Sequence, residues 1–380
     1  MKKLASIAMV ILALGAALAL AVPLAGCEMP EPAQDVWADF RHGLTNTGYA
    51  LSRAVEKTTV EWTYQTGFIV SSPSVKYDQV YVGGSDGAIY CIEKDKGGLV
   101  WKYQTGDAVL SSPAIAGHKV FVGSDDGCVY ALDENNGDLE WKAALGAPVR
   151  SSPAVAHDKV LVGCDDGYLY VLDENEGNVL WKFGTGGPIT SSPAVKSEKV
   201  YFGSDDGFIY AVDEKDEELV WKYRTGGPVH SSPAVGKNEV YCGSDDSFIY
   251  CLDEDNGSLL WKYQTGGAVL CSPAVAYGQV YVGSDDGFIY CLKEGDKGGQ
   301  LVWKLPTGGP VRSSPAVADH RLYVASYDGF LYCLDEKDAK LIFKYEIGGQ
   351  PYSAPAIASS PTVAAHKLYI GNTSIICFKG

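Results

Sequence analysis

An acidic pair recurs along the chain and is the first place to look for metal chemistry. It stands in the turn Gly123-Ser124-Asp125-Asp126-Gly127 and returns around Asp86, Asp166, Asp206, Asp246, Asp286 and Asp328. Hard cations take several carboxylate oxygens, so a ring of calcium sites or an acidic docking face is one interpretation. Aspartate also accepts backbone amides in tight turns, and the same turn would need the same pair in every copy. We favour the turn interpretation and expect no metal site.

One position varies although its neighbours stay constant: the residue directly before each Ser-Ser-Pro motif. The series is Val70, Leu110, Arg150, Thr190, His230, Leu270, Arg312 and Tyr352. A single asymmetric ligand would require such divergence within nearly identical repeats. Two arginines in an acidic protein also suggest contact with an anion or a carboxylate. Neutral drift of exposed loops is the interpretation that we favour. Arg150, His230, Arg312 and Tyr352 are nevertheless the best candidate binding residues.

No arrangement of residue types indicates catalysis. The six histidines are scattered, with none at metal-ligand spacing, and the serines of the repeated motif are multiplied along the chain. One aromatic residue per repeat favours packing between neighbouring sheets over quinone stacking. These aromatic residues are Trp62, Trp101, Trp141, Trp181, Trp221, Trp261, Trp303 and Phe343. We expect no catalytic residue and no cofactor.

The chain has ten cysteines, and their spacing argues against disulfides. Equivalent repeat positions hold Cys91, Cys251, Cys291, Cys333 and Cys377. Packed sheets lie roughly 10 Å apart, whereas a disulfide needs a Cβ separation of about 4 Å. We expect all cysteines except Cys27 to be small buried thiols.

These residues sit in a repeat whose period is 40 residues. The prolines of its Ser-Ser-Pro motif, or of a near copy, are Pro73, Pro113, Pro153, Pro193, Pro233, Pro273, Pro315 and Pro355. One repeat predicts four short strands, at 111–116, 120–123, 128–133 and 139–143, joined by tight turns. One such sheet cannot bury both faces alone, whereas radial stacking of all the sheets gives a β-propeller.

The two ends of the chain predict how the ring closes. The first tryptophan strand, Val60 to Tyr64, precedes every Ser-Ser-Pro motif, and the last motif, near Pro355, has no tryptophan strand after it. The N-terminal strand should therefore complete the C-terminal sheet, which leaves no open edge in the ring. The prediction is an all-β protein with eight four-stranded antiparallel blades. A linear solenoid is the alternative, and the mismatched ends argue against it.

The repeat resembles that of the PQQ-like propellers, from Gly203 to Asp213 and then Trp221-Lys222-Tyr223. The opening 37–41, Trp-Ala-Asp-Phe-Arg, with 46–48, Asn-Thr-Gly, is similar to the start of such propellers. The resemblance covers 37–380 and implies one of two branches. One comprises dehydrogenases that bind pyrroloquinoline quinone (PQQ) and calcium, and the other comprises non-enzymatic lipoproteins such as the propeller subunit of the outer-membrane β-barrel assembly machinery. The dehydrogenase branch fits poorly, because this chain has no adjacent cysteines, no Cys-x-x-Cys-His and no large insertions.

The N-terminus indicates export. Lys2 and Lys3 precede an uncharged apolar run that ends in Leu24-Ala25-Gly26-Cys27, which resembles a lipoprotein signal with acylation at Cys27. An uncleaved membrane span is the alternative. We expect a signal peptide over 1–26, a tether over 27–36 and the propeller over 37–380. Because residue 28 is Glu rather than Asp, the resemblance allows an outer-membrane destination.

Composition limits the function. Lys and Arg number 31 against 47 Asp and Glu, and the resulting net charge of −16 disfavours nucleic-acid binding. We expect a monomeric, lipid-anchored propeller of the cell envelope that acts as a non-catalytic scaffold for an envelope protein, with a role in outer-membrane protein assembly. The alternative is a PQQ-dependent dehydrogenase or a small-molecule sensor that uses the mouth of the central channel. The residues before the Ser-Ser-Pro motifs should surround this mouth, because the chain crosses there from an outer strand to the next innermost strand.

Overall fold

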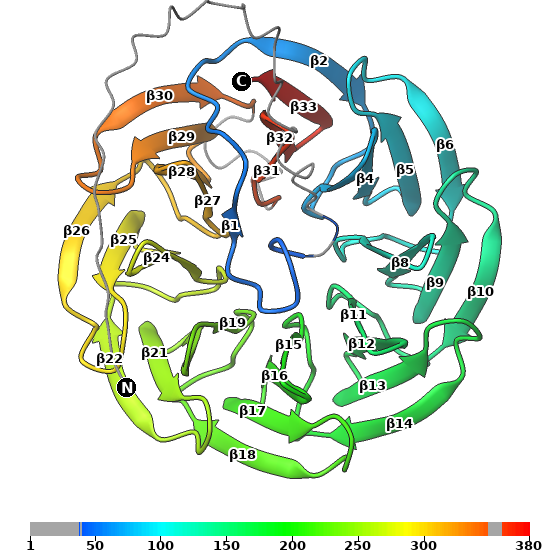
Figure 1. The fold of residues 1–380 in the computed structure, drawn as a ribbon, viewed down its shortest axis with the longest axis horizontal. Coiled ribbons are helices and arrows are strands. Elements are labelled where there is room, and N and C mark those ends of the chain that lie inside the picture. The colour runs from blue at the N-terminus through cyan, green and yellow to red at the C-terminus, as the bar shows by residue number, and fades with distance from the viewer. Residues whose placement is uncertain (1–37, 39, 349–358) are drawn as a thin grey trace, which may run out of the picture. The chain divides into compact units, whose positions relative to one another are not determined.

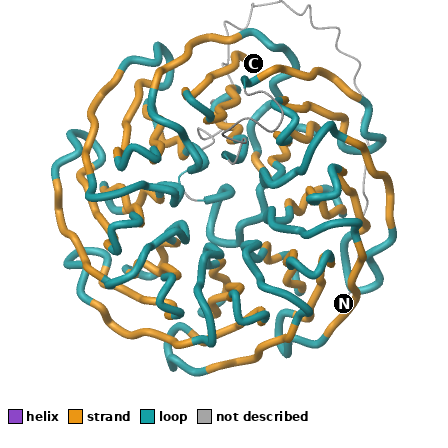
Figure 2. Tube along the Cα trace, turned by 180° about the vertical axis from the view of Figure 1, so that it is seen from behind, coloured by secondary structure: helices purple, strands orange, loops and turns teal. Residues whose placement is uncertain are grey.

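A computed structural model describes residue 38 and residues 40–348 and 359–380. Eight antiparallel sheets are arranged around a central axis, and each contributes one blade to a closed ring (Figure 1). All regular structure in the described ranges is β-strand, with loops between strands and no helix (Figure 2). The predicted eight-bladed propeller is confirmed.

Each blade has an innermost strand, two middle strands and an outer strand. The innermost strands are β3 (Ser74–Lys76), β7 (Ala114–Ala116), β11 (Ala154–Ala156), β15 (Ala194–Lys196), β19 (Ala234–Val235), β23 (Ala274–Ala276), β27 (Ala316–Ala318) and β31 (Thr362–Ala364). The second strands are β4 (Gln79–Gly83), β8 (Lys119–Gly123), β12 (Lys159–Gly163), β16 (Lys199–Ser204), β20 (Glu239–Gly243), β24 (Gln279–Gly283), β28 (Arg321–Ala325) and β32 (Lys367–Gly371). The third strands are β5 (Ala88–Glu93), β9 (Cys128–Asp133), β13 (Tyr168–Asp173), β17 (Phe208–Asp213), β21 (Phe248–Asp253), β25 (Phe288–Lys293), β29 (Phe330–Asp335) and β33 (Ser374–Lys379). The outer strands are β6 (Leu99–Gln104), β10 (Leu139–Ala144), β14 (Val179–Gly184), β18 (Leu219–Arg224), β22 (Leu259–Gln264), β26 (Leu301–Pro306), β30 (Leu341–Glu346) and β2 (Val60–Gln65).

The local sequence explains each blade. In the second blade, Gly127 takes a φ of +83° in the turn between β8 and β9, a conformation that glycine adopts without strain. Both middle strands are buried almost throughout, so they appear in the sequence as continuous apolar runs, whereas β10 alternates and keeps only its tryptophan buried. A bulge between Leu139 and Trp141 aligns that tryptophan with Ala131.

The hydrophobic core lies between blades. Trp101 of the first blade packs its ring against Gly137 of the second, where a Cβ atom would lie 2.6 Å from the indole. Its Nε1 donates to the carbonyl oxygen of Glu134 at 3.0 Å. Trp62, Trp141 and Trp221 make the equivalent bond to the next blade. The packing interpretation of the repeated tryptophans is confirmed.

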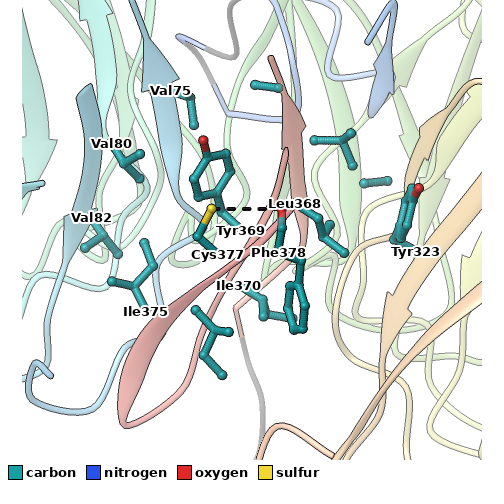
Figure 3. Close-up of a cluster of buried hydrophobic side chains, with 14 of the residues drawn as sticks. Val75, Val80, Val82, Tyr323, Leu368, Tyr369, Ile370, Ile375, Cys377 and Phe378 are labelled. Carbon is teal, nitrogen blue, oxygen red and sulfur yellow. Dashed lines mark hydrogen bonds between the residues drawn. The ribbon is translucent and has the colours of Figure 1, made fainter. Parts of the chain in front are cut away.

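The ring closes with the N-terminal strand. β2 pairs antiparallel with β33, and Trp62 lies opposite Cys377. At the same junction, one buried hydrophobic cluster contains Val80 of the first blade together with Leu368 and Phe378 of the last blade (Figure 3). The predicted closure, with an N-terminal strand lent to the last blade, is confirmed.

Eight serines form a second closure around the axis. The backbone amide of the second serine in each Ser-Ser-Pro motif donates to the hydroxyl oxygen of the equivalent serine in the next blade, at 2.8–3.2 Å. We call this set the serine belt: Ser72, Ser112, Ser152, Ser192, Ser232, Ser272, Ser314 and Ser360. The repeated serines are therefore structural.

The belt corrects one prediction about the eighth blade. The motif that starts its innermost strand is Ser359-Ser360-Pro361, which leads into β31, and not the near copy that contains Pro355. Ala354 has no hydroxyl and could not take the place of Ser360 in the belt. The spacing carried this information. In six of the other seven blades the proline lies ten residues before the end of the second strand, and Pro361 keeps that distance from Gly371.

A segment upstream of β2 crosses the channel, where Figure 1 shows it as a blue loop inside the ring. Its carbonyl oxygens accept amides from the innermost strands, among them Val195 to Leu44 at 2.6 Å and Val275 to Thr47 at 2.9 Å. It ends in β1 (Tyr49–Ala50), which pairs parallel with β27. The sequence analysis did not predict this crossing. We call residues 40–50 the channel segment.

The nine cysteines of the described ranges are all buried and free, as predicted for these residues. No helix of the described residues is long and apolar enough to cross a membrane. The predicted signal peptide, tether and acylated Cys27 lie outside the described residues.

Candidate functional site

Arg150 lies between two blades at one end of the channel. Its Nε and Nη2 face the two carboxylate oxygens of Asp125 at 3.0 and 3.3 Å, and its Nη1 lies 3.0 Å from Oδ2 of Asp165. The arginine therefore bridges two aspartates that belong to successive blades. Its side chain is 44% exposed, so the bridge faces solvent.

His230 occupies the equivalent place two blades further on. Its Nδ1 lies 3.0 Å from Oδ1 of Asp245, and its Nε2 lies 3.2 Å from Oδ1 of Asp205. A neutral imidazole has only one N–H, so only the imidazolium form offers a proton to both carboxylates.

Arg312 makes the third such contact. Its Nε and Nη2 bind both oxygens of Asp285, at 2.8 and 2.9 Å, and its guanidinium stacks over the ring of Tyr327. Tyr352, the fourth candidate, lies outside the described residues. In the corrected register of the eighth blade, the residue before Ser-Ser-Pro is residue 358, which is outside them as well.

Together these side chains form a ring around the end of the channel, here called the mouth ring. Its first set consists of the described residues before the Ser-Ser-Pro motifs of the first seven blades, from Val70 to Arg312. Its second set consists of the first residue of each turn between the second and third strands. That second set includes Asp125, Asp165, Asp205, Asp245 and Asp285 in five successive blades. The structure places Arg150 and His230 each between two aspartates and Arg312 against Asp285 and Tyr327, but it does not bring the three cations into contact with one another.

One arc of the mouth ring has polar atoms without partners. Oδ1 of Asp165 and Oγ1 of Thr190 have no hydrogen-bond partner, and Oδ1 of Asp205 has only the ion-pair contact with His230. Burial, together with the neighbouring carboxylates, raises the pKa of Asp165 and of Asp205 above the usual aspartate value. This arc therefore contains buried polar atoms whose hydrogen-bonding capacity is not fully used by the residues that the structure describes.

The two aspartates of each acidic turn have different roles, which the sequence analysis did not separate. The second is a turn residue: Asp126 accepts the amide of Cys128 at 3.0 Å, the amide of Gly106 at 3.0 Å and the hydroxyl of Tyr130. The first, such as Asp125, is bound through its side chain to a mouth cation instead. The signal was present in the sequence: the second position is aspartate in seven blades, but among these the first becomes Ser85 in one blade and Tyr327 in another.

The dehydrogenase alternative requires room for a quinone and ligands for calcium. The channel segment fills the axis at the level of the innermost strands, and the cavity beside it has a volume of about 10 Å³, room for roughly one water molecule. Within residues 40–348 and 359–380, no group of three or more His, Cys, Asp or Glu side chains is arranged to hold a metal ion. The described residues around this cavity do not fit a quinone and its calcium ion.

Two comparisons address the family. A family model described as outer membrane protein assembly factor BamB matches residues 44–182, 165–276 and 246–378. The three matches together run through all eight blades. No curated protein matches the chain.

Solved structures share the fold at low identity. BamB from Moraxella catarrhalis is 20% identical, with a TM-score of 0.69 over 84% of this chain and 98% of that one. The computationally designed Ika8 protein is 17% identical, with a TM-score of 0.75 over 85% and 100%. Quinohemoprotein alcohol dehydrogenase from Comamonas testosteroni is 14% identical, with a TM-score of 0.77 over 90% and 80%. At these identities the likeness concerns the fold alone, and it extends to both predicted branches.

Proposed function

The chain belongs to the propeller family described as outer membrane protein assembly factor BamB, and from this we propose that it is a non-catalytic docking protein of the cell envelope that takes part in outer-membrane protein assembly. The mouth ring is the proposed docking site. Cys27 is the proposed point of lipid attachment, which would hold the propeller at a membrane surface.

The main support is the distribution of variation around the ring. Positions that build the fold, such as the serine belt and the second aspartate of each turn, are the same in nearly every blade. The mouth ring differs from blade to blade: Val70 and Leu110 are uncharged, whereas Arg150 lies between two carboxylates. An asymmetric partner needs an asymmetric surface, and this ring provides one on a rigid frame.

Charge indicates the chemistry of the partner. Five aspartates of the ring stand in successive blades, and among the described residues of the ring the cations that oppose them are Arg150, His230 and Arg312. The side chains of Asp165 and Asp205 are 17% and 26% exposed, so their accessible oxygens would accept hydrogen bonds from lysine or arginine side chains. The whole chain has a net charge of −16, so long-range electrostatic attraction also favours a positively charged partner. We therefore propose a partner that presents a basic surface.

Site-specific crosslinking in intact envelopes tests this proposal. A photoreactive residue is placed at Thr190, between Asp165 and Asp205, and the matched control is placed at Leu219 on an outer strand, which is 42% exposed. We expect position 190 to yield an adduct with a component of the outer-membrane protein assembly pathway, identified by mass spectrometry, and position 219 to yield none. Equal adducts from both positions, or no adduct from position 190, would overturn the docking site.

A charge reversal separates electrostatic docking from mere proximity. Asp205→Lys should reduce the yield of the adduct at position 190 at least tenfold, because it replaces an acceptor with a like charge for the partner. The control Asp255→Lys changes a carboxylate whose side chain is 87% exposed and lies outside the mouth ring, and it should leave the yield unchanged. The dehydrogenase alternative predicts instead that purified protein given quinone and calcium oxidises alcohols or sugars, and that result would end the non-catalytic proposal.

A further inference from the structure

Arg41 is a buried cation with no counterion among the residues that the structure describes. Only 2% of its surface is exposed, and its guanidinium donates to two backbone oxygens, from Nη1 to Ser272 at 2.5 Å and from Nη2 to Pro315 at 3.0 Å. Its Nε has no acceptor. No carboxylate of the described ranges is paired with it, and burial lowers the pKa of Arg41 to about 9, so the group remains charged at neutral pH. A buried charge is costly unless it is both paired and hydrogen-bonded.

A small cavity adjoins this arginine. Arg41 lines it together with Ser72, Ser314, Ser360 and Thr362. Its volume of about 10 Å³ is enough for one water-sized particle. A chloride ion is only slightly larger than a water molecule, whereas phosphate or an organic anion is far too large for this space.

The lining supplies hydrogen-bond donors. Each hydroxyl oxygen of the serine belt accepts a backbone amide, as Ser72 does from Ser360 and Ser360 from Ser314. A hydroxyl also has a proton to donate, and for the belt serines of this cavity no acceptor is found among the residues that the structure describes. Arg41 is also a lining residue, and its Nε–H is a charged donor that has no acceptor among the described residues. Several donors and one uncompensated positive charge around a water-sized space form an anion site.

We propose that the cavity beside Arg41 binds one monovalent anion of halide size, which is chloride in the cell, held by the arginine and the belt hydroxyls. Water would satisfy the hydrogen bonds but not the charge, which is why the site favours an ion. The inference does not rest on the proposed docking function, because the site lies within the channel and not on the mouth ring.

The ion would fasten the channel segment to the ring. Arg41 belongs to that segment, whereas Ser72, Ser314 and Ser360 belong to the first, seventh and eighth blades. The site thus spans the place where the first and last blades meet. Halide binding should therefore stabilise closure of the whole propeller and not one blade alone.

Bromide diffraction tests the site directly. The full chain, extracted in detergent, is crystallised with sodium bromide in place of chloride, and anomalous data are collected at the bromine absorption edge. We expect an anomalous peak in the cavity, within hydrogen-bond distance of the Nε of Arg41. If only a water without anomalous signal occupies the cavity, the proposal is wrong.

Thermal unfolding of the same protein provides the second test. At constant ionic strength, the Tm should rise by a few degrees and saturate as gluconate, which is too large for the cavity, is replaced by bromide. Arg41→Met should abolish this rise, and the control Arg150→Met, at an exposed arginine of the mouth ring, should keep it. A Tm rise of equal size in Arg41→Met would reflect general ion effects on stability and would contradict the site. If Arg41→Met does not fold, the anomalous diffraction data from the unmodified protein still show whether bromide occupies the cavity.

Discussion

The backbone amide of Ser360 lies 3.2 Å from Oγ of Ser72, so the last blade is joined to the first by the contact that joins every other pair of neighbours. The two serines are separated by 288 residues in the sequence. Because the belt is continuous, the ring has no weak seam at the axis. At the rim, the pairing of β2 with β33 closes the same junction a second time.

Replacing Ser72 should therefore cost as much as replacing a belt serine inside the ring. Ser72→Ala leaves the buried amide of Ser360 without an acceptor, and an unmet buried donor costs about 1–3 kcal/mol. Ser112→Ala does the same to the amide of Ser72. Urea denaturation should give similar losses for both variants. If Ser112→Ala lowers the free energy of unfolding and Ser72→Ala does not, the belt is open between the last and the first blade.

The two aspartates of one turn should respond differently to alanine. Asp126 accepts three hydrogen bonds, so Asp126→Ala should lower the free energy of unfolding by about 2–4 kcal/mol. Asp125 is bound only to the half-exposed Arg150, so Asp125→Ala should cost less than about 1 kcal/mol. Equal losses in chemical denaturation would contradict the division into turn residues and mouth residues.

Gly48 should not tolerate a side chain, because it packs against Arg41. It has a φ of +63°, and a Cβ atom there would lie 2.1 Å from Nη2 of Arg41 and 2.9 Å from the carbonyl oxygen of Pro315. Gly48→Ala should therefore lower the Tm well below that of the control Gly278→Ala, which has a φ of +74° with nothing within 4 Å. Because both glycines have a positive φ, the difference in Tm between the two variants measures the steric clash separately from the cost of the backbone conformation. Similar Tm values would show that Arg41 can move away at little cost.

Most of the fold could be predicted because the same pattern of strands and turns recurs in every blade. A turn such as 125–127 and a strand such as 128–133 depend on local residues, and β9 has the predicted bounds. The prediction for the eighth blade was wrong because Ser353-Ala354-Pro355 matches the short motif by itself. The position of the innermost strand depends instead on its distance from the strand with which it forms a hairpin. Similarity of a short motif therefore predicted the wrong start for this strand, because strand pairing determines where it lies.

The site could be predicted only in part, for a related reason. The variable residues Arg150, His230 and Arg312 were found by their variation. Their aspartate partners were missed because each belongs to a neighbouring turn that also has a structural aspartate. The contacts of Arg41 join it to blades more than 200 residues away. No local pattern contains such a contact, so the channel segment could be seen only in three dimensions.

Asp165 should make the protein less stable at neutral pH than a neutral side chain would. Burial, then Asp125 and Asp205, raises its pKa against the opposing effect of Arg150, so the folded state binds this proton more tightly than the unfolded state does. The associated stabilisation is present below the usual aspartate pKa of 3.8 and is lost as the pH rises through the higher folded value.

Asp165→Asn should consequently raise the Tm at pH 7, and the gain should shrink as the pH falls towards 4. Arg150 keeps both of its bonds to Asp125 in this variant. The control Asp255→Asn should show no such trend, because its side chain is 87% exposed. A gain that grows on acidification would have the wrong sign for a raised pKa.

Thiol titration should find nine buried, reduced cysteines and also report on Cys27. Burial raises the pKa of Cys242 to about 12 and that of Cys271 to about 11, and the thiolate is the reactive form. We therefore expect the nine described thiols of the native protein to react with Ellman's reagent only as fast as the protein unfolds. In denaturant without reductant, nine thiols should react if Cys27 carries a lipid thioether, and ten if it is free. Fewer than nine would mean that some cysteines are paired as disulfides, against the free thiols seen in every described blade position.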